Sequence, residues 1–204
     1  MALLAALVAC TSPLAKPQPS PLPSPTPHTA ATATVLQQTD VPSSLGPCAG
    51  TGSIGTYLAA LHSTNPTLAD ELGRRWDDMK ALGAYDAAIS LFAADPSACS
   101  AEFAAAANIK SAASEVIVFG DEGQADRAWQ TGTLGFTVPA PSEQPPGITR
   151  GVSTGLGESS WIYVQAPVQM AVWRKSVFLA VVVFTNLDAA SFKAGAAAVN
   201  ARLN

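Results

Sequence analysis

The chain has 204 residues, of which 48% are apolar and 13% are charged, and its formal net charge is −4. Nucleic-acid binding and polybasic membrane attachment both require a basic surface, so this charge balance argues against either. Residues 35–204 follow a proline-rich stretch and are numerous enough for one domain with its own core.

The N-terminus is a short apolar run, residues 2–9, that ends in the sequence Leu7-Val8-Ala9-Cys10. These four residues resemble the lipobox of bacterial lipoproteins. The resemblance implies a signal segment at 1–9, cleavage before Cys10, and a diacylglyceryl thioether on the Cys10 sulfur, often with a further fatty acyl chain such as palmitate on its amine. Two or more acyl chains anchor a protein stably. We therefore expect a protein that contacts the cell membrane through lipid on Cys10 and lies at its extracytoplasmic face.

The apolar run departs from the usual secretory signal, because no Lys or Arg precedes it. A start codon assigned too late would explain the missing basic residues. The alternative is an ordinary apolar N-terminus with a coincidental cysteine. Residues 177–184 form another long apolar run, but it is far shorter than a membrane-spanning helix requires.

Residues 10–34 are predicted to be a tether, with prolines at nearly every second position from Pro13 to Pro27. Alternating prolines disfavour helix and sheet and favour the extended polyproline II conformation. At about 3.1 Å per residue, this stretch would make a semi-rigid spacer of about 40–50 Å. The alternative is a proline-rich ligand for an aromatic groove on another protein.

Two cysteines remain beyond the tether, Cys48 and Cys99. In an exported domain, an even pair predicts a disulfide. Two buried free thiols are the alternative. Metal binding is disfavoured, because the cysteines lie far apart in the sequence and have no histidines beside them.

The first half of the domain is expected to mix strands and helices. Residues 35–42 are predicted to begin with a short edge strand, and residues 54–62 to form a helix. Asn65-Pro66 is typical of a helix start, with the apolar side chains of the next four turns on one face and Gly83 at the end. Residues 85–92 fit either a strand or a helix, and the alanine-rich residues 100–113 favour a partly helical segment.

The second half is expected to be a sheet followed by a helix. Residues 115–119 predict a strand, and Asp121 predicts the start of the helix after it. Three strands are predicted at 161–165, 170–173 and 177–184, the last of them central because it is apolar on both faces. Asp188 would cap a final helix. The predicted fold is α+β, a mostly antiparallel sheet of four to six strands packed by three or four helices.

Two short sequences match catalytic or cofactor-binding motifs. Residues 50–55 match the glycine pattern of dinucleotide-binding loops, but the residues before them do not predict the required buried strand. Residues 151–155 match the nucleophile elbow of serine hydrolases, yet no histidine follows Ser153, and His62 is the only one within the domain. A Ser–Lys pair would need a lysine that the sequence does not mark. We expect no cofactor and no metal site.

The hypothesis we favour is a non-enzymatic domain that binds or senses a small ligand, or another envelope protein, outside the membrane. The domain loosely resembles, in outline and composition, the extracytoplasmic sensor-type domains of actinobacterial lipoproteins and kinases. If so, Trp161, Tyr163 and Trp173 are the candidate ligand-binding residues, in a cleft beside the terminal sheet. The alternatives are an envelope hydrolase or transferase without a familiar motif, and a structural partner of another envelope protein.

Overall fold

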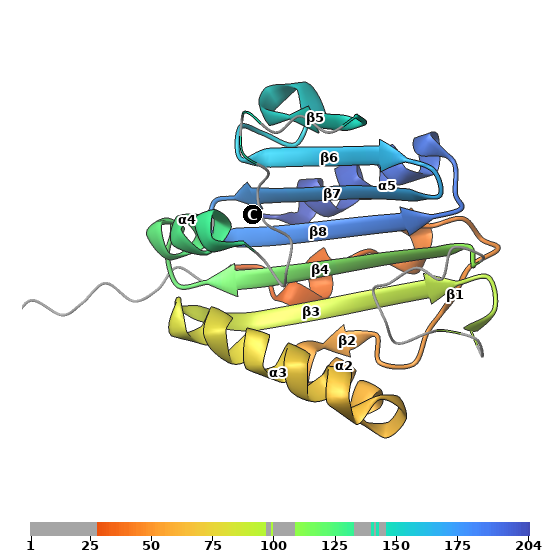
Figure 1. The fold of residues 1–204 in the computed structure, drawn as a ribbon, viewed down its shortest axis with the longest axis horizontal. Helices are drawn as coiled ribbons and strands as arrows, with labels where there is room; N and C mark the ends of the chain where they lie inside the picture. The colour runs from red at the N-terminus through yellow and green to blue at the C-terminus, as the bar shows by residue number, and fades with distance from the viewer. Residues whose placement is uncertain (1–27, 97–98, 100–108, 133–139, 141, 143–145) are drawn as a thin grey trace, which may run out of the picture.

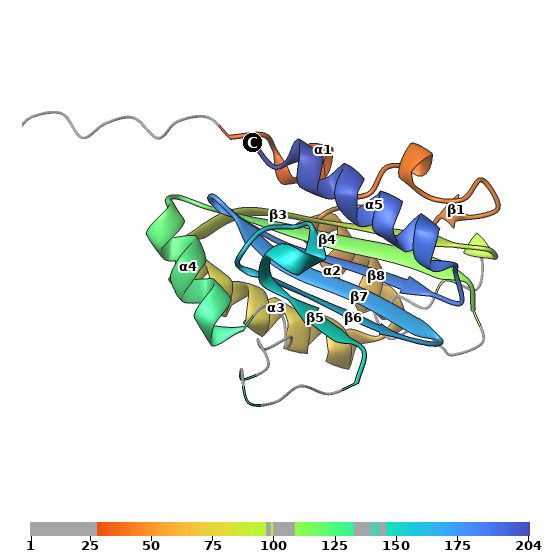
Figure 2. The same ribbon diagram turned by 90° about the horizontal axis from the view of Figure 1, so that it is seen from above.

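The computed structural model describes residues 28–96, 99, 109–132, 140, 142 and 146–204. These residues form one antiparallel sheet with helices on both of its faces (Figures 1 and 2). The α+β class is therefore confirmed. The sheet has eight strands in the described part of the chain, more than the four to six that we predicted.

The strands are β1 (Gly46–Pro47), β2 (Gly52–Ser53), β3 (Ala84–Ala93), β4 (Ser111–Phe119), β5 (Ile148–Arg150), β6 (Ser160–Gln165), β7 (Val168–Lys175) and β8 (Phe178–Thr185). The α-helices are α1 (Ala31–Thr34), α2 (Ile54–Thr64), α3 (Pro66–Ala81), α4 (Glu122–Thr131) and α5 (Ala189–Arg202). Two 3₁₀ turns are described, η1 (Gln38–Asp40) and η3 (Gly151–Thr154). The strand order is β1-β3-β4-β8-β7-β6-β5, and β2 also pairs with β3.

The additional strands are short, and this explains the low predicted count. β1 and β2 have two residues each and β5 has three. Such short edge strands show no alternation of apolar and polar residues, so pattern reading misses them. The ambiguous residues 85–92 belong to strand β3. The alanine-rich stretch was expected to be partly helical up to residue 113, but its last residues, from Ser111, begin β4; residues 100–108 lie outside the described part.

Strand β8 is the central strand that its composition predicts. All eight of its residues are buried, and it pairs with β4 on one side and β7 on the other. Both of its faces are covered: α1 and α5 lie on one side of the sheet, and α2, α3 and α4 on the other (Figure 2).

The predicted helix starts are confirmed by their caps. The Asn65 side chain accepts a hydrogen bond from the Leu68 N–H (3.1 Å) at the start of α3. Asp121 and Asp188 cap α4 and α5 in the same way. Each cap satisfies a backbone N–H that the first helical turn leaves unpaired.

The last helix packs unusually close to the sheet at Gly195. A Cβ atom placed there would lie 2.8 Å from Phe184 Cζ and 3.2 Å from Leu36 Cδ2. Gly73, in the middle of α3, has nothing within 4 Å of the same position. A side chain is therefore excluded at Gly195 by packing, whereas Gly73 has room for one.

The segment that enters the domain from the tether crosses the α5 face of the sheet, and the edge strand predicted within residues 35–42 is not formed. The Leu36 N–H donates to Ser114 Oγ (2.8 Å), a side chain in the middle of the sheet. A hydrogen bond to a side chain takes the place of a strand ladder here. The segment instead forms α1 and the turn η1 on either side of Leu36.

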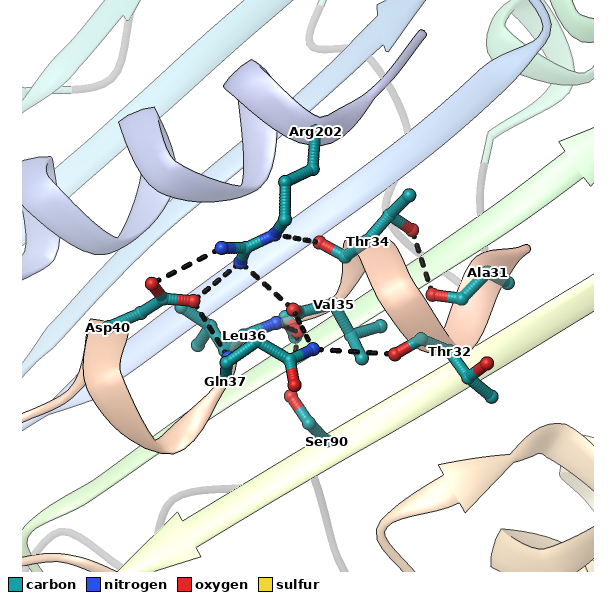
Figure 3. A network of polar contacts seen from close by, with 10 residues as sticks. Ala31, Thr32, Thr34, Val35, Leu36, Gln37, Asp40, Ser90 and Arg202 are labelled. Carbon is teal, nitrogen blue, oxygen red and sulfur yellow. Dashed lines mark hydrogen bonds and ion pairs between the residues drawn. The ribbon is translucent and has the colours of Figure 1, made fainter. Parts of the chain in front are cut away.

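Arg202, in the last turn of α5, holds this entering segment in place (Figure 3). Its guanidinium forms an ion pair with the Asp40 carboxylate (2.5 Å) and donates to the carbonyl oxygens of Thr34 (3.3 Å) and Val35 (3.0 Å). The planar guanidinium can reach all three acceptors at once, which an ammonium cannot do in the same geometry. The two ends of the domain are thus joined beside the point where the tether enters.

The predicted disulfide is present between Cys48 and Cys99, with the Cα atoms 5.8 Å apart. It links the segment between β1 and β2 to the connection between β3 and β4. Because it closes a loop of 51 residues, the chain-entropy model gives it about 4 kcal/mol of stabilisation.

Candidate functional site

A cleft of about 530 Å³ lies on the α5 face of the sheet, above β6. Helix α5 packs against β7 and β8. Within the described residues no helix covers β5 and β6 on this side, where the turn η3 and the loop after it form the opposite wall. The cleft exists because α5 leaves the last two strands of the sheet, β6 and β5, uncovered.

Apolar side chains form most of the cleft. Ile162 and Val164 project from β6, Phe192 from α5, and Leu156 from the loop after η3. Val164 is 42% exposed and is one of three large apolar side chains that the described residues leave exposed. Another of the three, Val152 at 71%, lies in η3 beside the cleft. Apolar surface left open to water at a concave site is a feature of binding sites.

Four polar side chains line the cleft, and three of them, Thr149, Ser153 and Lys193, are exposed, which places them at its edge. Ser153 and Thr154 come from η3, Thr149 from β5 and Lys193 from α5. Thr154 has an internal role, because its hydroxyl pairs with Ser160 Oγ (2.6 Å) and accepts from the Leu156 N–H (3.0 Å). The Lys193 ammonium and the Ser153 hydroxyl have no partner among the described residues, so both are available to a ligand.

Hydrogen bonds hold the wall of the cleft in position. The Ser160 hydroxyl lies within hydrogen-bonding distance of two carbonyl oxygens, those of Gly151 (3.1 Å) and Gly157 (2.5 Å). Gly151 begins η3, and Gly157 lies in the loop that follows it. Ser160 is buried and belongs to β6, which ties the wall to the sheet. The cleft is therefore largely preformed.

The three aromatic residues expected to bind a ligand do not lie together. Trp161 and Tyr163 share one face of β6 and belong to the same apolar cluster as Trp129 of α4. Trp173 faces α5, is fully buried, and donates its indole N–H to Asn200 Oδ1 (3.1 Å). None of the three lines the cleft described above.

A buried carboxyl lies on the other face of the sheet. Glu115, in β4, is 2% exposed and stands opposite Ile89 on one neighbouring strand and Val181 on the other. The described residues give it no hydrogen-bond partner, and burial raises the pKa of Glu115 to about 8. In the same cross-strand row, the buried Trp161 indole N–H also lacks a partner within the described part of the chain.

A perturbed acid is a recognised feature of functional sites. Glu115, however, has apolar neighbours on both adjacent strands, and it does not line the cleft above β6. Sequence reading missed Glu115, because the predicted strand 115–119 placed it at a strand end, whereas it lies in the middle of β4, which begins at Ser111. A charged residue within such a strand was the signal that could have marked it.

The catalytic motifs in the sequence do not assemble into a site. His62 lies on α2, which packs against β3, whereas Ser153 follows β5. Five inter-strand spacings of about 4.8 Å separate β3 from β5. A nucleophile elbow holds its serine in a strained backbone turn. Among the described non-glycine residues only Ser176 and Asn186 have a positive φ angle, so Ser153 does not show this strain. Residues 50–55 lead into α2 from a two-residue antiparallel strand, which is not the parallel unit of a dinucleotide-binding fold.

Ser153 and Lys193, by contrast, are brought to the same cleft by residues far apart in the sequence. No hydrogen bond joins them, and both side chains are exposed. The lysine is thus placed to attract a negatively charged group. It is not positioned to take a proton from the serine within hydrogen-bonding distance.

The described residues contain no helix long and apolar enough to cross a membrane. They also contain no group of three or more His, Cys, Asp or Glu side chains that would hold a metal ion. Cys10 and most of the tether lie outside the described residues. No protein-family model, curated protein or solved structure matches the chain.

Proposed function

We propose that this chain is a lipid-anchored, extracytoplasmic protein of the bacterial cell envelope whose domain binds a small apolar ligand in the cleft above β6. The cleft is the observation on which the binding proposal rests. Its volume falls in the range of small-molecule sites, and it combines apolar walls with a few polar groups at the edge.

The disulfide supports the proposed location. A disulfide that closes a long loop between Cys48 and Cys99 is typical of proteins that fold outside the reducing cytoplasm. The proposed anchor itself rests on the lipobox-like sequence and the proline-rich tether. The cleft lies toward the N-terminal half of α5, while Thr29, near the end of the predicted tether, donates to the Asn204 carbonyl oxygen beyond the other end of that helix. The cleft and the attachment of the tether thus lie toward opposite ends of α5.

The anchor is tested by expressing the full chain in a bacterial host and measuring its distribution between membrane and soluble fractions, together with its intact mass. We expect a membrane-bound form that carries the mass of lipid on Cys10. Cys10→Ser should abolish both properties, whereas Thr11→Ala should keep them. An unlipidated, uncleaved wild-type chain would contradict the anchor.

The cleft is tested with Nile red, an uncharged apolar dye, and the soluble Cys10→Ser chain. We expect its fluorescence to rise on binding, and Ala197→Trp to abolish the rise because Ala197 lines the cleft and is exposed. Ala194→Trp is the matched control, since Ala194 is also exposed on α5 but does not line the cleft. Equal binding by both variants would contradict the proposed site.

A hydrolase is the second candidate, and the presence of Ser153 and Lys193 in one cleft is the observation that favours it. If the chain is a hydrolase, the Cys10→Ser chain should hydrolyse p-nitrophenyl butyrate, and Ser153→Ala should lose that activity. We expect instead no hydrolysis above the uncatalysed rate, because no hydrogen bond links Ser153 to Lys193.

A further inference from the structure

The cleft above β6 has an apolar interior and a single charged group at its edge. Lys193 is the only charged residue among the described residues that line it. The apolar walls would contact the body of a ligand, while the ammonium would meet only one part of it. This division of the surface describes an amphipathic ligand, with an apolar body and a charged end.

The charge at the edge is not neutralised by the protein. Within the described part of the chain, Lys193 forms no ion pair. The nearest acidic residues in the sequence are Asp188 and Glu158. Asp188 is occupied in capping α5, where it accepts from the backbone N–H (2.8 Å) and hydroxyl (2.8 Å) of Ser191. Glu158 is exposed on the loop before β6 and does not line the cleft.

The number of donors limits the kind of anion. One ammonium and the unpartnered hydroxyl of Ser153 provide a single positive charge and one additional donor. A carboxylate matches this supply, whereas a phosphate group carries more charge and more acceptors and is usually met by arginines or by several backbone N–H groups.

The shape of the cleft favours a slender apolar body. Its α5 wall extends from Ala189 to Ala197, about 12 Å along the helix, and includes the small residues Ala189, Ala196 and Ala197. An extended hydrocarbon chain can lie along such a wall. We infer that the ligand bound above β6 is a long-chain carboxylate of the fatty-acid class, with its chain against β6 and α5 and its carboxylate at Lys193. This inference rests on the proposed binding function and assigns its ligand class.

The inference is tested by displacement of 11-(dansylamino)undecanoic acid from the Cys10→Ser chain, with dodecanoate and dodecan-1-ol as competitors. The two competitors have the same chain and differ in charge. We expect dodecanoate to bind about fivefold more tightly than the alcohol, and affinity to rise roughly threefold to fourfold for each added methylene.

Two kinds of variant distinguish the contribution of the Lys193 charge from that of the apolar cleft. Lys193→Gln should remove the preference for dodecanoate and leave the affinity for the alcohol unchanged, while Lys193→Arg should retain it. Arg127→Gln is the charge control, because Arg127 is exposed on α4 at the other face of the sheet. Ala197→Trp should abolish binding of both competitors.

Each alternative result has a distinct meaning. Equal affinities for acid and alcohol, both lost in Ala197→Trp, would overturn the carboxylate inference while supporting the cleft as an apolar site. Binding that Ala197→Trp does not change, or no binding of either competitor, would overturn the inference and the proposed function together. Circular dichroism of each variant establishes that a loss of binding is not a loss of folding.

Discussion

Replacing Glu115 by glutamine should change how the stability of the domain depends on pH. The carboxyl is buried in β4 without a described hydrogen-bond partner, and burial raises its pKa from 4.5 to about 8. Between these values the folded protein holds a proton that the unfolded chain has lost. The free energy of unfolding therefore falls as pH rises across this window, and it is insensitive to Glu115 below about 4.5 and above about 8.

The magnitude follows from the size of the shift. One proton of difference between the two states corresponds to a slope of about 1.4 kcal/mol per pH unit. The wild-type domain should thus lose about 2–3 kcal/mol between pH 5.5 and pH 7.5 through Glu115 alone. Glu115→Gln keeps the shape of the side chain without an ionisable proton, so this pH-dependent loss should disappear. The free energy of unfolding of the variant should therefore increase relative to that of the wild type as pH rises.

The assay is urea unfolding followed by tryptophan fluorescence at half-unit pH steps, with the wild-type curve compared to that of Glu115→Gln. Taking the difference removes the contributions of other titrating groups. Glu158→Gln, at an exposed glutamate, is the control and should leave the wild-type slope unchanged. Parallel pH profiles for wild type and Glu115→Gln would refute the reasoning, because they would mean that the carboxyl is ionised in the folded protein.

Three further predictions concern stability and share the same urea assay. Reducing the Cys48–Cys99 bridge should cost about 4 kcal/mol and slow migration on a denaturing gel; an unchanged unfolding midpoint would contradict the loop-closure argument. Gly73→Ala should stabilise α3 by about 0.5–1 kcal/mol, whereas Gly195→Ala should destabilise the domain because its Cβ would meet Phe184; equal effects would argue against that close packing. Arg202→Met should cost about 2–3 kcal/mol, because Asp40 and two carbonyl oxygens lose a shared donor. Arg202→Lys should recover little of this stability, since an ammonium cannot reach all three acceptors. Full recovery by lysine would show that charge alone matters.

Local features of the sequence predicted most of the regular elements. The caps at Asn65, Asp121 and Asp188 each lie next to the helix that they were expected to begin. The uninterrupted apolar run of β8 indicated a central strand covered on both faces, as observed. Such features depend on residues within a few positions of one another, so they can be recognised without knowledge of the fold.

Elements that depend on distant partners were not predicted well. The segment around Leu36 has the composition of a strand, yet its backbone bonds to the Ser114 side chain and it crosses the sheet. The two-residue strands exist only because β3 lies beside them. In each case the deciding hydrogen bond joins residues that are far apart in the chain.

The sequence by itself determined the disulfide pair, the capped helices and the buried central strand, because composition, spacing and residue type suffice for these. Only the tertiary structure decided which side chains share a site. Trp161 lies opposite Val172 in the β6–β7 register, so Trp173, one residue further, must point to the other face. The same long-range pairing brings η3 and α5 to the two sides of β6, which places Ser153 and Lys193 at one cleft and leaves Glu115 in the core on the opposite side.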